Sequence, residues 1–299
     1  MRARKRLTSK DKDKFYTNPK AVTSFLENIE RVIPLSSFDR IIEPSAGNGK
    51  FLDQLPANAE GYDLYPERDD IKQQDFLQLN IESGTLFDDA SKILVIGNPP
   101  FGTGYMNPLA RDFFNHAAQF AHTIAFIIPA SWDSSWKIHR QLDPQFGLYY
   151  SEVLPEKSFL LDGKPYNVNC CMQIWSKQSL GTNIRIMQRP PTSHEDFDMF
   201  LTCDGVARRK EVREQLTNRE YWEFGIKYWG DIRIDEIDTI DPMTTTHFVI
   251  KANKPYVRKV FESIDWDQYM RYMGARHIGS KATLVQAYTD AVKKVHITS

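Results

Sequence analysis

The sequence predicts an α/β fold in which a doubly wound, mostly parallel sheet is joined to a smaller C-terminal domain. Short apolar runs of strand length alternate with amphipathic stretches over about the first 178 residues, a pattern typical of parallel sheets with helices on both faces. A glycine loop follows the first predicted strand, which is short, and the composition changes near residue 178. The chain therefore divides into a large N-terminal α/β domain and a distinct C-terminal region.

The individual elements are predicted from spacing and from end signals. Residues 17–33 form an amphipathic helix, with Asn18 as N-cap, Pro19 at the first helical position and Pro34 at its end. Further strands are predicted at residues 38–42, 60–66, 93–96, 123–130 and 168–175, and further helices at residues 51–55 and 107–121 and near the C-terminus, in KATLVQAYTDAV.

The bulk composition is that of an ordinary globular protein. Of the 299 residues 41% are hydrophobic, and the formal net charge is −1. No apolar run approaches the roughly 20 residues of a membrane span, so no membrane partner is expected. Three cysteines without metal-site spacing favour a reduced, intracellular setting and no metal. The basic segment 1–14 is either a tail that contacts phosphates or a solvated terminus.

The loop EPSAGNG, residues 43–49, carries the first candidate site. Its glycines allow unusual backbone angles and a close approach of a ligand, and Glu43 places a carboxylate at the end of the strand. Asp63 follows 20 residues later, the distance at which an acid meets a ribose in dinucleotide folds. No pyrophosphate signature accompanies them, so S-adenosylmethionine fits better than NAD or ATP. A tight strand-to-helix turn without a ligand is the alternative.

The tetrapeptide NPPF, residues 98–101, carries the second candidate site. It follows a buried strand, and its two adjacent prolines cannot donate backbone hydrogen bonds and hold the chain extended. A loop that only had to turn would more often use Gly, Asn or Ser. We therefore expect this segment to be stiff for a chemical reason.

Together, FYTNP (15–19), EPSAGNG and NPPF resemble the motifs of the N6-adenine DNA methyltransferases, in the order of that family. The resemblance covers residues 12–178. It implies the family's seven-stranded methyltransferase sheet, S-adenosylmethionine as cofactor and adenine in nucleic acid, most simply double-stranded DNA, as substrate. It also implies a prokaryotic or virus-infected cell, in the cytoplasm or nucleoid, with a nucleus as an alternative.

The resemblance assigns roles to individual positions. The cofactor-binding candidates are Phe15, Tyr16, Thr17, Pro19, Glu43, Pro44, Ser45, Ala46, Gly47, Gly49, Asp63, Asp75 and Phe76. The catalytic candidates are Asn98, Pro99, Pro100 and Phe101, and the candidates for stacking on the target base are Phe159 and Tyr166.

The chemistry accounts for the residue types in NPPF. The exocyclic amine of adenine is a poor nucleophile because its lone pair is conjugated with the ring. The side-chain oxygen of Asn98 and the carbonyl of Pro99 can accept its N–H groups and stabilise the developing positive charge. The prolines hold that carbonyl in a fixed direction, and Phe101 offers a stacking face to a base flipped out of the duplex.

The resemblance implies that the region 179–299 recognises the target or binds a partner, because the segment between DFL (75–77) and the strand before NPPF is too short for a recognition domain. Its net charge is close to neutral. Basic residues at 208–213 could face a phosphate backbone, or form a solvated helix face. The aromatic cluster YWEFGIKYWG, residues 221–230, could stack on bases or form the core of a small domain.

Three alternatives stay open at this point. The same chemistry could act on adenine in RNA, because the tetrapeptide reads an amine and not the sugar. A related pocket, with Tyr in place of Phe101, occurs in enzymes that methylate guanine N2 or a glutamine amide. A non-catalytic subunit with this fold could bind nucleic acid, a sister protein or a second copy of the chain.

Overall fold

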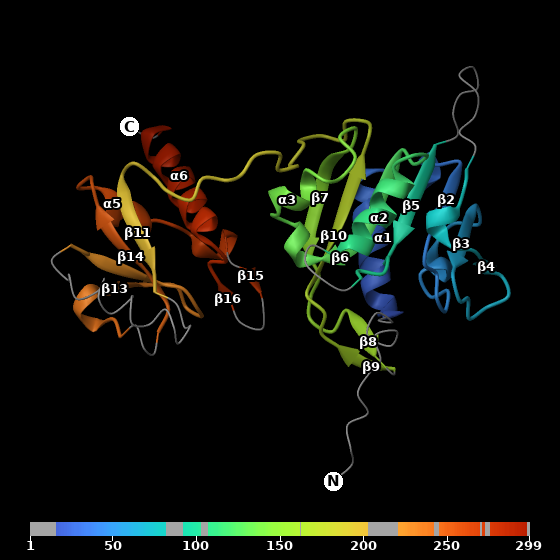
Figure 1. Ribbon diagram of the computed structural model, residues 1–299, viewed down its shortest axis with the longest axis horizontal. Helices are drawn as coiled ribbons and strands as arrows, with labels where there is room; N and C mark the ends of the chain where they lie inside the picture. The colour runs from blue at the N-terminus through green and yellow to red at the C-terminus, as the bar shows by residue number, and fades with distance from the viewer. Residues whose placement is uncertain are drawn as a thin grey trace, which may run out of the picture. The chain divides into compact units, whose positions relative to one another are not determined.

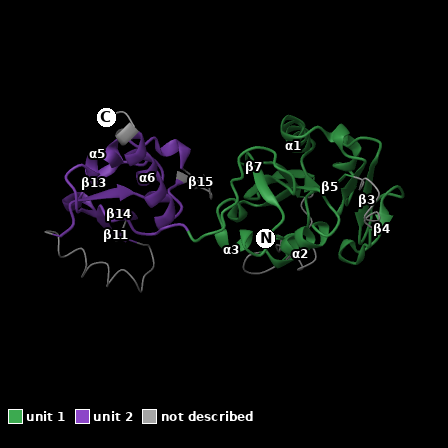
Figure 2. Cartoon of the chain, turned by 90° about the horizontal axis from the view of Figure 1, so that it is seen from above, with its two compact units in different colours: residues 1–189 green, residues 190–299 purple. Residues whose placement is uncertain are grey.

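The computed structural model describes residues 16–81, 92–102, 107–161, 163–202, 221–241, 245–269, 271–272 and 276–297. The chain divides into two compact units, residues 1–189 and 190–299 (Figure 2). Phe15, the basic segment 1–14 and the basic residues at 208–213 lie outside the described ranges.

Unit 1 is built on a seven-stranded sheet with the order β4-β3-β2-β5-β6-β10-β7 (Figure 1). The strands are β2 (Arg40–Glu43), β3 (Ala59–Asp63), β4 (Lys72–Gln73), β5 (Ile93–Gly97), β6 (Thr123–Pro129), β7 (Gly147–Val153) and β10 (Cys170–Ser176). All neighbours pair in parallel up to β6, and β10 pairs antiparallel with both β6 and β7. This confirms the predicted fold class.

Helices cover both faces of the sheet, each through a separate apolar cluster. On one face α1 (Pro19–Val32) buries Phe25 and Ile29 against the sheet. On the other face α2 (Pro108–Ala117) buries Phe113 and Phe114, and the short α3 (Trp136–His139) adds Ile138 to the same cluster. Because adjacent residues of a strand point to opposite faces, central strands such as β5 are buried at every position.

The N-terminus of α1 follows its sequence signal. The Asn18 side chain accepts a hydrogen bond from the amide of Lys20, and Pro19 is the first helical residue, as predicted. The predicted helix at 51–55 is wrong, because only a single 3₁₀ turn, η3 (Leu52–Gln54), forms there. Pro56 disfavours helical angles at the residue before it and leaves too little chain for an α-helix.

A separate three-stranded sheet brings the N-terminal segment to the main body of unit 1. Strand β1 (Tyr16–Thr17) pairs antiparallel with β8 (Phe159–Leu161), which pairs in turn with β9 (Lys164–Tyr166). Thr17 lies opposite Phe159, whose side chain is fully buried in the cluster beneath α1. The sequence did not predict this hairpin.

The chain leaves unit 1 along the edge strand β7. Ile184 donates its amide to the carbonyl of Leu148, which covers part of that edge. The Arg185 guanidinium donates to four backbone carbonyls, those of His139, Leu142, Asp143 and Phe146. Residues 183–186, which lie beyond the expected boundary at 178, therefore pack on unit 1.

Unit 2 has its own antiparallel sheet, in the order β11-β14-β12-β13. The strands are β11 (Phe197–Leu201), β12 (Phe224–Lys227), β13 (Ile234–Glu236) and β14 (His247–Ala252), with the short pair β15 (Arg271–Tyr272) and β16 (Arg276–His277) beside them. Helices α5 (Val257–Glu262) and α6 (Lys281–Ile297) share one core with this sheet. Within the described ranges, none of the helices has the length and hydropathy that a bilayer crossing requires.

The aromatic cluster at 221–230 belongs mainly to this core. Phe224 is fully buried and Tyr228 packs against the core cluster, while Trp229 is 39% exposed. Phe224 and Tyr228 thus belong to the core of unit 2, while Trp229 packs on Tyr228 and His277 with part of its ring exposed.

Elsewhere in unit 2, the buried Asp196 accepts the hydroxyl hydrogen bonds of Tyr288 and Tyr256.

Candidate active site

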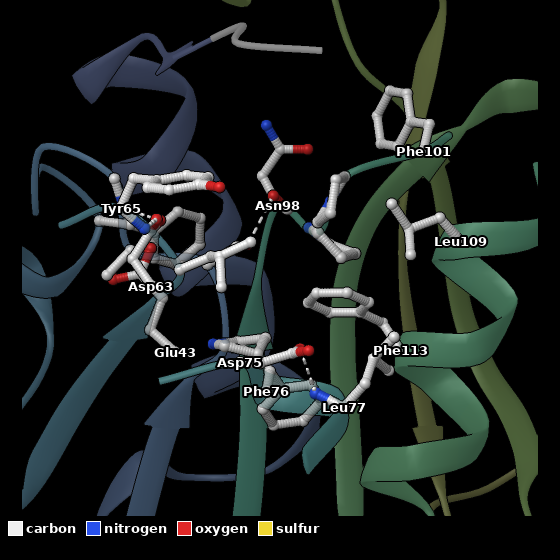
Figure 3. A pocket seen from close by; sticks show the side chains of 18 of the residues that line it. Glu43, Asp63, Tyr65, Asp75, Phe76, Leu77, Asn98, Phe101, Leu109 and Phe113 are labelled. Atoms are coloured by element: carbon white, nitrogen blue, oxygen red, sulfur yellow. Dashed lines mark hydrogen bonds between the residues drawn. The ribbon is translucent and has the colours of Figure 1, made fainter. Parts of the chain in front are cut away.

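Unit 1 contains a cavity of about 820 Å³ where strands β2, β3 and β5 end. The carboxyl edge of a parallel sheet is the usual ligand site in such folds. Figure 3 shows Glu43 and Asp63 on one side of Asn98, and Phe101, Leu109 and Phe113 on the other. Fourteen of the predicted site residues line the cavity: Tyr16, Thr17, Glu43, Pro44, Ser45, Ala46, Gly47, Asp63, Asp75, Phe76, Asn98, Pro99, Pro100 and Phe101.

Four predicted residues are placed elsewhere. Pro19 begins α1 and does not line the cavity. Phe159 is fully buried beneath α1, so its ring has no face free for a base. Tyr166 lies on β9, is 43% exposed and does not line the cavity. Gly49 is also outside the lining.

The glycine loop, which follows β2, is fixed by hydrogen bonds to β3 and to the residue that follows β5. The Ser45 hydroxyl donates to the backbone carbonyl of Asn98 at 3.0 Å, and the Ala46 amide donates to the carbonyl of Tyr62 at 2.9 Å. Gly47 has φ +52° and donates its amide to Asp63 Oδ2 at 2.7 Å. The loop therefore ties the ends of β2, β3 and β5 together beside the cavity.

Gly49 has a different role from the one that the sequence suggests. Its φ is +75°, and a Cβ atom there would lie 2.3 Å from Nη1 of Arg68. The guanidinium of Arg68, and not a ligand, occupies the space beside this glycine. Bare backbone toward the cavity is provided by Gly47 alone of the two glycines.

Glu43 is the most unusual charged group of the cavity. It is 3% exposed, and its Oε2 atom has no hydrogen-bond partner among the described residues. Burial raises the pKa of Glu43 to about 8, against the opposing effect of the Leu52 amide. A buried carboxyl without a cationic partner costs free energy in its charged form. It suits a ligand that brings a positive charge or a hydrogen-bond donor.

Asp63 and Asp75 present carboxylates from two other segments. Asp63 accepts the amides of both Gly47 and Tyr65, at 2.7 and 2.8 Å. Each carboxylate oxygen can accept a further hydrogen bond from a ligand. Asp75 caps the turn η4 (Phe76–Gln78) by accepting the amide of Leu77. Both acids thus organise backbone and face the cavity at the same time.

The cavity has an apolar wall that the sequence did not predict. Leu109 and Phe113 of α2 lie one helical turn apart and both line the cavity, together with Asp112. The Phe113 ring stacks on Phe76, with 5.2 Å between the ring centroids. The i, i+4 spacing within the predicted helix 107–121 could have indicated this face. These two rings therefore add apolar contacts to the cavity wall.

Strand β5 ends at a glycine whose role is steric. Gly97 has φ +151°, and a Cβ atom there would lie 3.2 Å from Cγ of Glu43. Pro99 is buried, while Asn98 and Phe101 are half-buried at the cavity. Gly97 therefore lets the strand that carries Asn98 pass close to the buried carboxyl. Nothing in the local pattern distinguished it beforehand.

No group of three or more His, Cys, Asp or Glu side chains within the described ranges could hold a metal ion.

No protein-family model matches the chain, and no curated protein does. Among solved structures, a candidate RNA methyltransferase of Pyrococcus horikoshii is 15% identical with a TM-score of 0.41, and the match covers 55% of this chain and 86% of that one. A candidate class I S-adenosylmethionine-dependent methyltransferase of Listeria monocytogenes is 15% identical with a TM-score of 0.42, covering 56% and 62%. A Thermoplasma acidophilum protein is 13% identical with a TM-score of 0.34, covering 56% and 94%. Sequence identities and TM-scores this low carry no argument about function, so any assignment of function rests on the residues of the cavity.

Proposed function

We propose that this chain transfers a methyl group from S-adenosylmethionine to the N6 amine of adenine in DNA. One observation carries the proposal: Asn98 and Pro99 line the same cavity as the buried carboxyl of Glu43. The oxygens of Asn98 and Pro99 suit an amine that must be made nucleophilic. The carboxyl of Glu43 suits a cationic cofactor.

The residues of the cavity fit this cofactor. A volume of about 820 Å³ is in the range of small-molecule sites. Glu43 is suited to the positively charged methionine end, and Asp63 to the ribose hydroxyls. Phe76 and Phe113 offer an apolar surface to the adenine ring of the cofactor. Asp75, which also lines the cavity, could accept a hydrogen bond from the amine of that ring. Bound S-adenosylmethionine would supply the methyl group on a sulfonium centre and leave as the neutral thioether.

The chain's own contribution to the transfer is to prepare the amine. The Asn98 side-chain oxygen and the Pro99 carbonyl would each accept one N–H of the target amine, which releases the nitrogen lone pair from the ring. As the N–C bond forms and the C–S bond breaks, the same acceptors stabilise the positive charge on nitrogen. The surplus amine proton then passes to solvent. Ser45 holds the backbone carbonyl of Asn98, which fixes the segment in advance.

The base contacts are proposed at two positions. Phe101 is half-buried at the cavity and packs against both apolar clusters of unit 1. Tyr166 is exposed on the hairpin whose neighbouring strand β1 lines the cavity. Phe159 is withdrawn from this role because it is fully buried. We assign target recognition or partner binding to unit 2.

The test uses isotopically labelled S-adenosylmethionine with duplex DNA, single-stranded DNA and RNA of mixed sequence. We expect label in duplex DNA, lost in Asn98→Ala and kept in Asn58→Ala. Asn58 is a suitable control because it donates to the carbonyl of Phe38, away from the cavity. Label in RNA alone would show that the substrate is RNA and not DNA. Cofactor binding without label in any polymer would favour a protein substrate or a missing subunit.

A further inference from the structure

We propose that Arg68 is a positioning residue, which holds the glycine loop in its ligand-binding form from outside the cavity. The inference rests on the proposed function, because it assumes that S-adenosylmethionine binds beside that loop. Arg68 does not line the cavity, and its sequence context, PERDD, is that of an ordinary solvated charge run.

The guanidinium of Arg68 joins three segments. Nη1 donates to the carbonyl of Gly49 at 3.2 Å and to Asp53 Oδ1 of η3 at 2.5 Å. Nε and Nη2 bind the two oxygens of Asp70 at 2.9 and 2.6 Å. The amide of Asp53 in turn donates to the carbonyl of Gly49 at 2.8 Å. A planar group with five donors can satisfy all these acceptors at once, whereas a lysine ammonium cannot match the fork to Asp70.

Steric contact adds to these hydrogen bonds. A Cβ atom at Gly49 would lie 2.3 Å from Nη1 and 2.7 Å from Cζ of Arg68. The guanidinium therefore lies directly against the backbone of a residue with φ +75°. The contact with Arg68 therefore accounts for a glycine at position 49, which does not line the cavity.

The residue before Arg68 acts on the other glycine. The Glu67 amide donates to the carbonyl of Gly47 at 3.2 Å. Its carboxylate accepts the hydroxyl of Tyr16, a residue of the cavity wall. Consecutive residues thus hold the carbonyls of both glycines. Because the Gly47 amide also binds Asp63, losing this support would misplace the ribose-facing acid relative to the loop.

Arg68 also contributes charge to the site. Its positive charge lowers the pKa of the buried Glu43 carboxyl without contacting it, an effect smaller than the opposing ones of Asp63 and Asp53. Removing the guanidinium should therefore raise the pKa of Glu43 further. Cofactor binding would then require a higher pH, which a purely structural role of Arg68 would not predict.

The test compares Arg68→Met and Arg68→Lys with Arg40→Met. Arg40 is a matched control, because its side chain is 36% exposed against 33% for Arg68 and pairs with Glu60 without touching the loop. The dissociation constant for S-adenosylmethionine is measured by calorimetry from pH 6.5 to 9, on protein shown to be folded. We expect about tenfold weaker binding for Arg68→Met, an intermediate loss for Arg68→Lys and less than a twofold change for Arg40→Met. We also expect the pH midpoint of binding to rise in Arg68→Met alone.

A second readout needs no cofactor. Amide hydrogen exchange should become faster at Asp53 and Glu67 in ligand-free Arg68→Met, and not in Arg40→Met, because those amides bind the two glycine carbonyls. Unchanged exchange at both amides would overturn the inference, and so would wild-type affinity in Arg68→Met or an equal loss in both arginine variants. Failure of the wild-type protein to bind the cofactor would instead refute the proposed function.

Discussion

The backbone amide of Gly47 donates a hydrogen bond to the carboxylate of Asp63, with 2.7 Å between nitrogen and Oδ2. This contact joins the ends of two adjacent parallel strands, β2 and β3. The acid that the cofactor would use is therefore also the acid that shapes the glycine loop. Binding and local order should respond together when Asp63 changes.

Asp63→Asn should weaken S-adenosylmethionine binding about tenfold or more, because a hydrogen bond to a charged acceptor is stronger than one to an amide. Isothermal titration on the folded variant measures the effect. Asp39→Asn is the control, since Asp39 also accepts a backbone amide, that of Lys92 at 2.7 Å, but lies outside the cavity. Equal affinities of the Asp63 variant and the wild-type protein would remove Asp63 from the site.

Binding of the cationic cofactor should release a proton from Glu43. Its pKa is raised to about 8 in the folded protein, chiefly by burial, so the carboxyl is mostly protonated at pH 7 before the cofactor arrives. A bound positive charge favours the ionised form, and affinity should therefore rise as the pH increases toward 8 and level off above it. Calorimetry in two buffers of different ionisation enthalpy should show close to one proton released at pH 7. Equal enthalpies in both buffers would contradict this.

Glu43→Gln should separate stability from function. A carboxyl whose folded pKa is raised favours folding below its ordinary pKa, and that contribution is lost as the pH rises through about 8. The glutamine variant removes this loss, and we expect its free energy of unfolding at pH 8.5 to be about 2 kcal/mol higher than that of the wild-type protein. We expect the same variant to bind the cofactor at least tenfold more weakly. Thermal unfolding at pH 6 and 8.5 checks the sign, since the gain should be larger at the higher pH.

Asn98→Ala should lower kcat by about 10²–10³, as expected for the loss of one acceptor aimed at a transition-state charge. The dissociation constant for S-adenosylmethionine should change less than threefold, because Ser45 binds the backbone carbonyl of Asn98 and not its side chain. Single-turnover kinetics at saturating cofactor separate the two effects. A variant with normal kcat would exclude the proposed role of Asn98.

The two aromatic residues that the sequence proposed for base stacking should behave differently. Phe159→Ala should destabilise unit 1 by about 3–5 kcal/mol, because its ring is fully buried. Tyr166→Ala changes an exposed side chain, so we expect stability within about 0.5 kcal/mol and about a tenfold rise in the KM for DNA. Denaturant unfolding and steady-state kinetics give both values. Loss of stability in the Tyr166 variant would argue against a surface contact.

The sequence predicted the parts of the site that depend on local chemistry. A proline pair after a buried strand is unusual for a loop that only turns, and residues 98–101 and 43–48 both line the cavity, whereas Gly49 does not. What depends on distant contacts was not predictable. No motif singled out Arg68, because its contacts with Gly49 and Asp53 form only in the fold. Phe159 could equally have been a stacking residue or core until β8 was seen to pair with β1.

The fold shows the same division. The alternation of strands and helices was sufficient to predict a mostly parallel sheet, while its edge strands β4 and β7 and the separate hairpin β8–β9 were missed. In unit 2, strand β11 carries a charged residue between two aromatic ones, in FDMFL, so its pattern showed neither the helical nor the strand period clearly. There the aromatic cluster was compatible with base stacking, although such clusters more often form the core of a small domain, and the burial of Phe224 shows the core at that position.

The most direct test of the central claim is to identify the methylated atom. Duplex DNA treated with the protein and labelled S-adenosylmethionine is digested to nucleosides and separated by liquid chromatography with mass spectrometry. We expect the label in N6-methyl-2′-deoxyadenosine with the wild-type protein, and no label there when Asn98 is replaced by Ala. Label in a methylated cytosine or guanine, or in the protein alone, would contradict the claim that this cavity prepares the N6 amine of adenine.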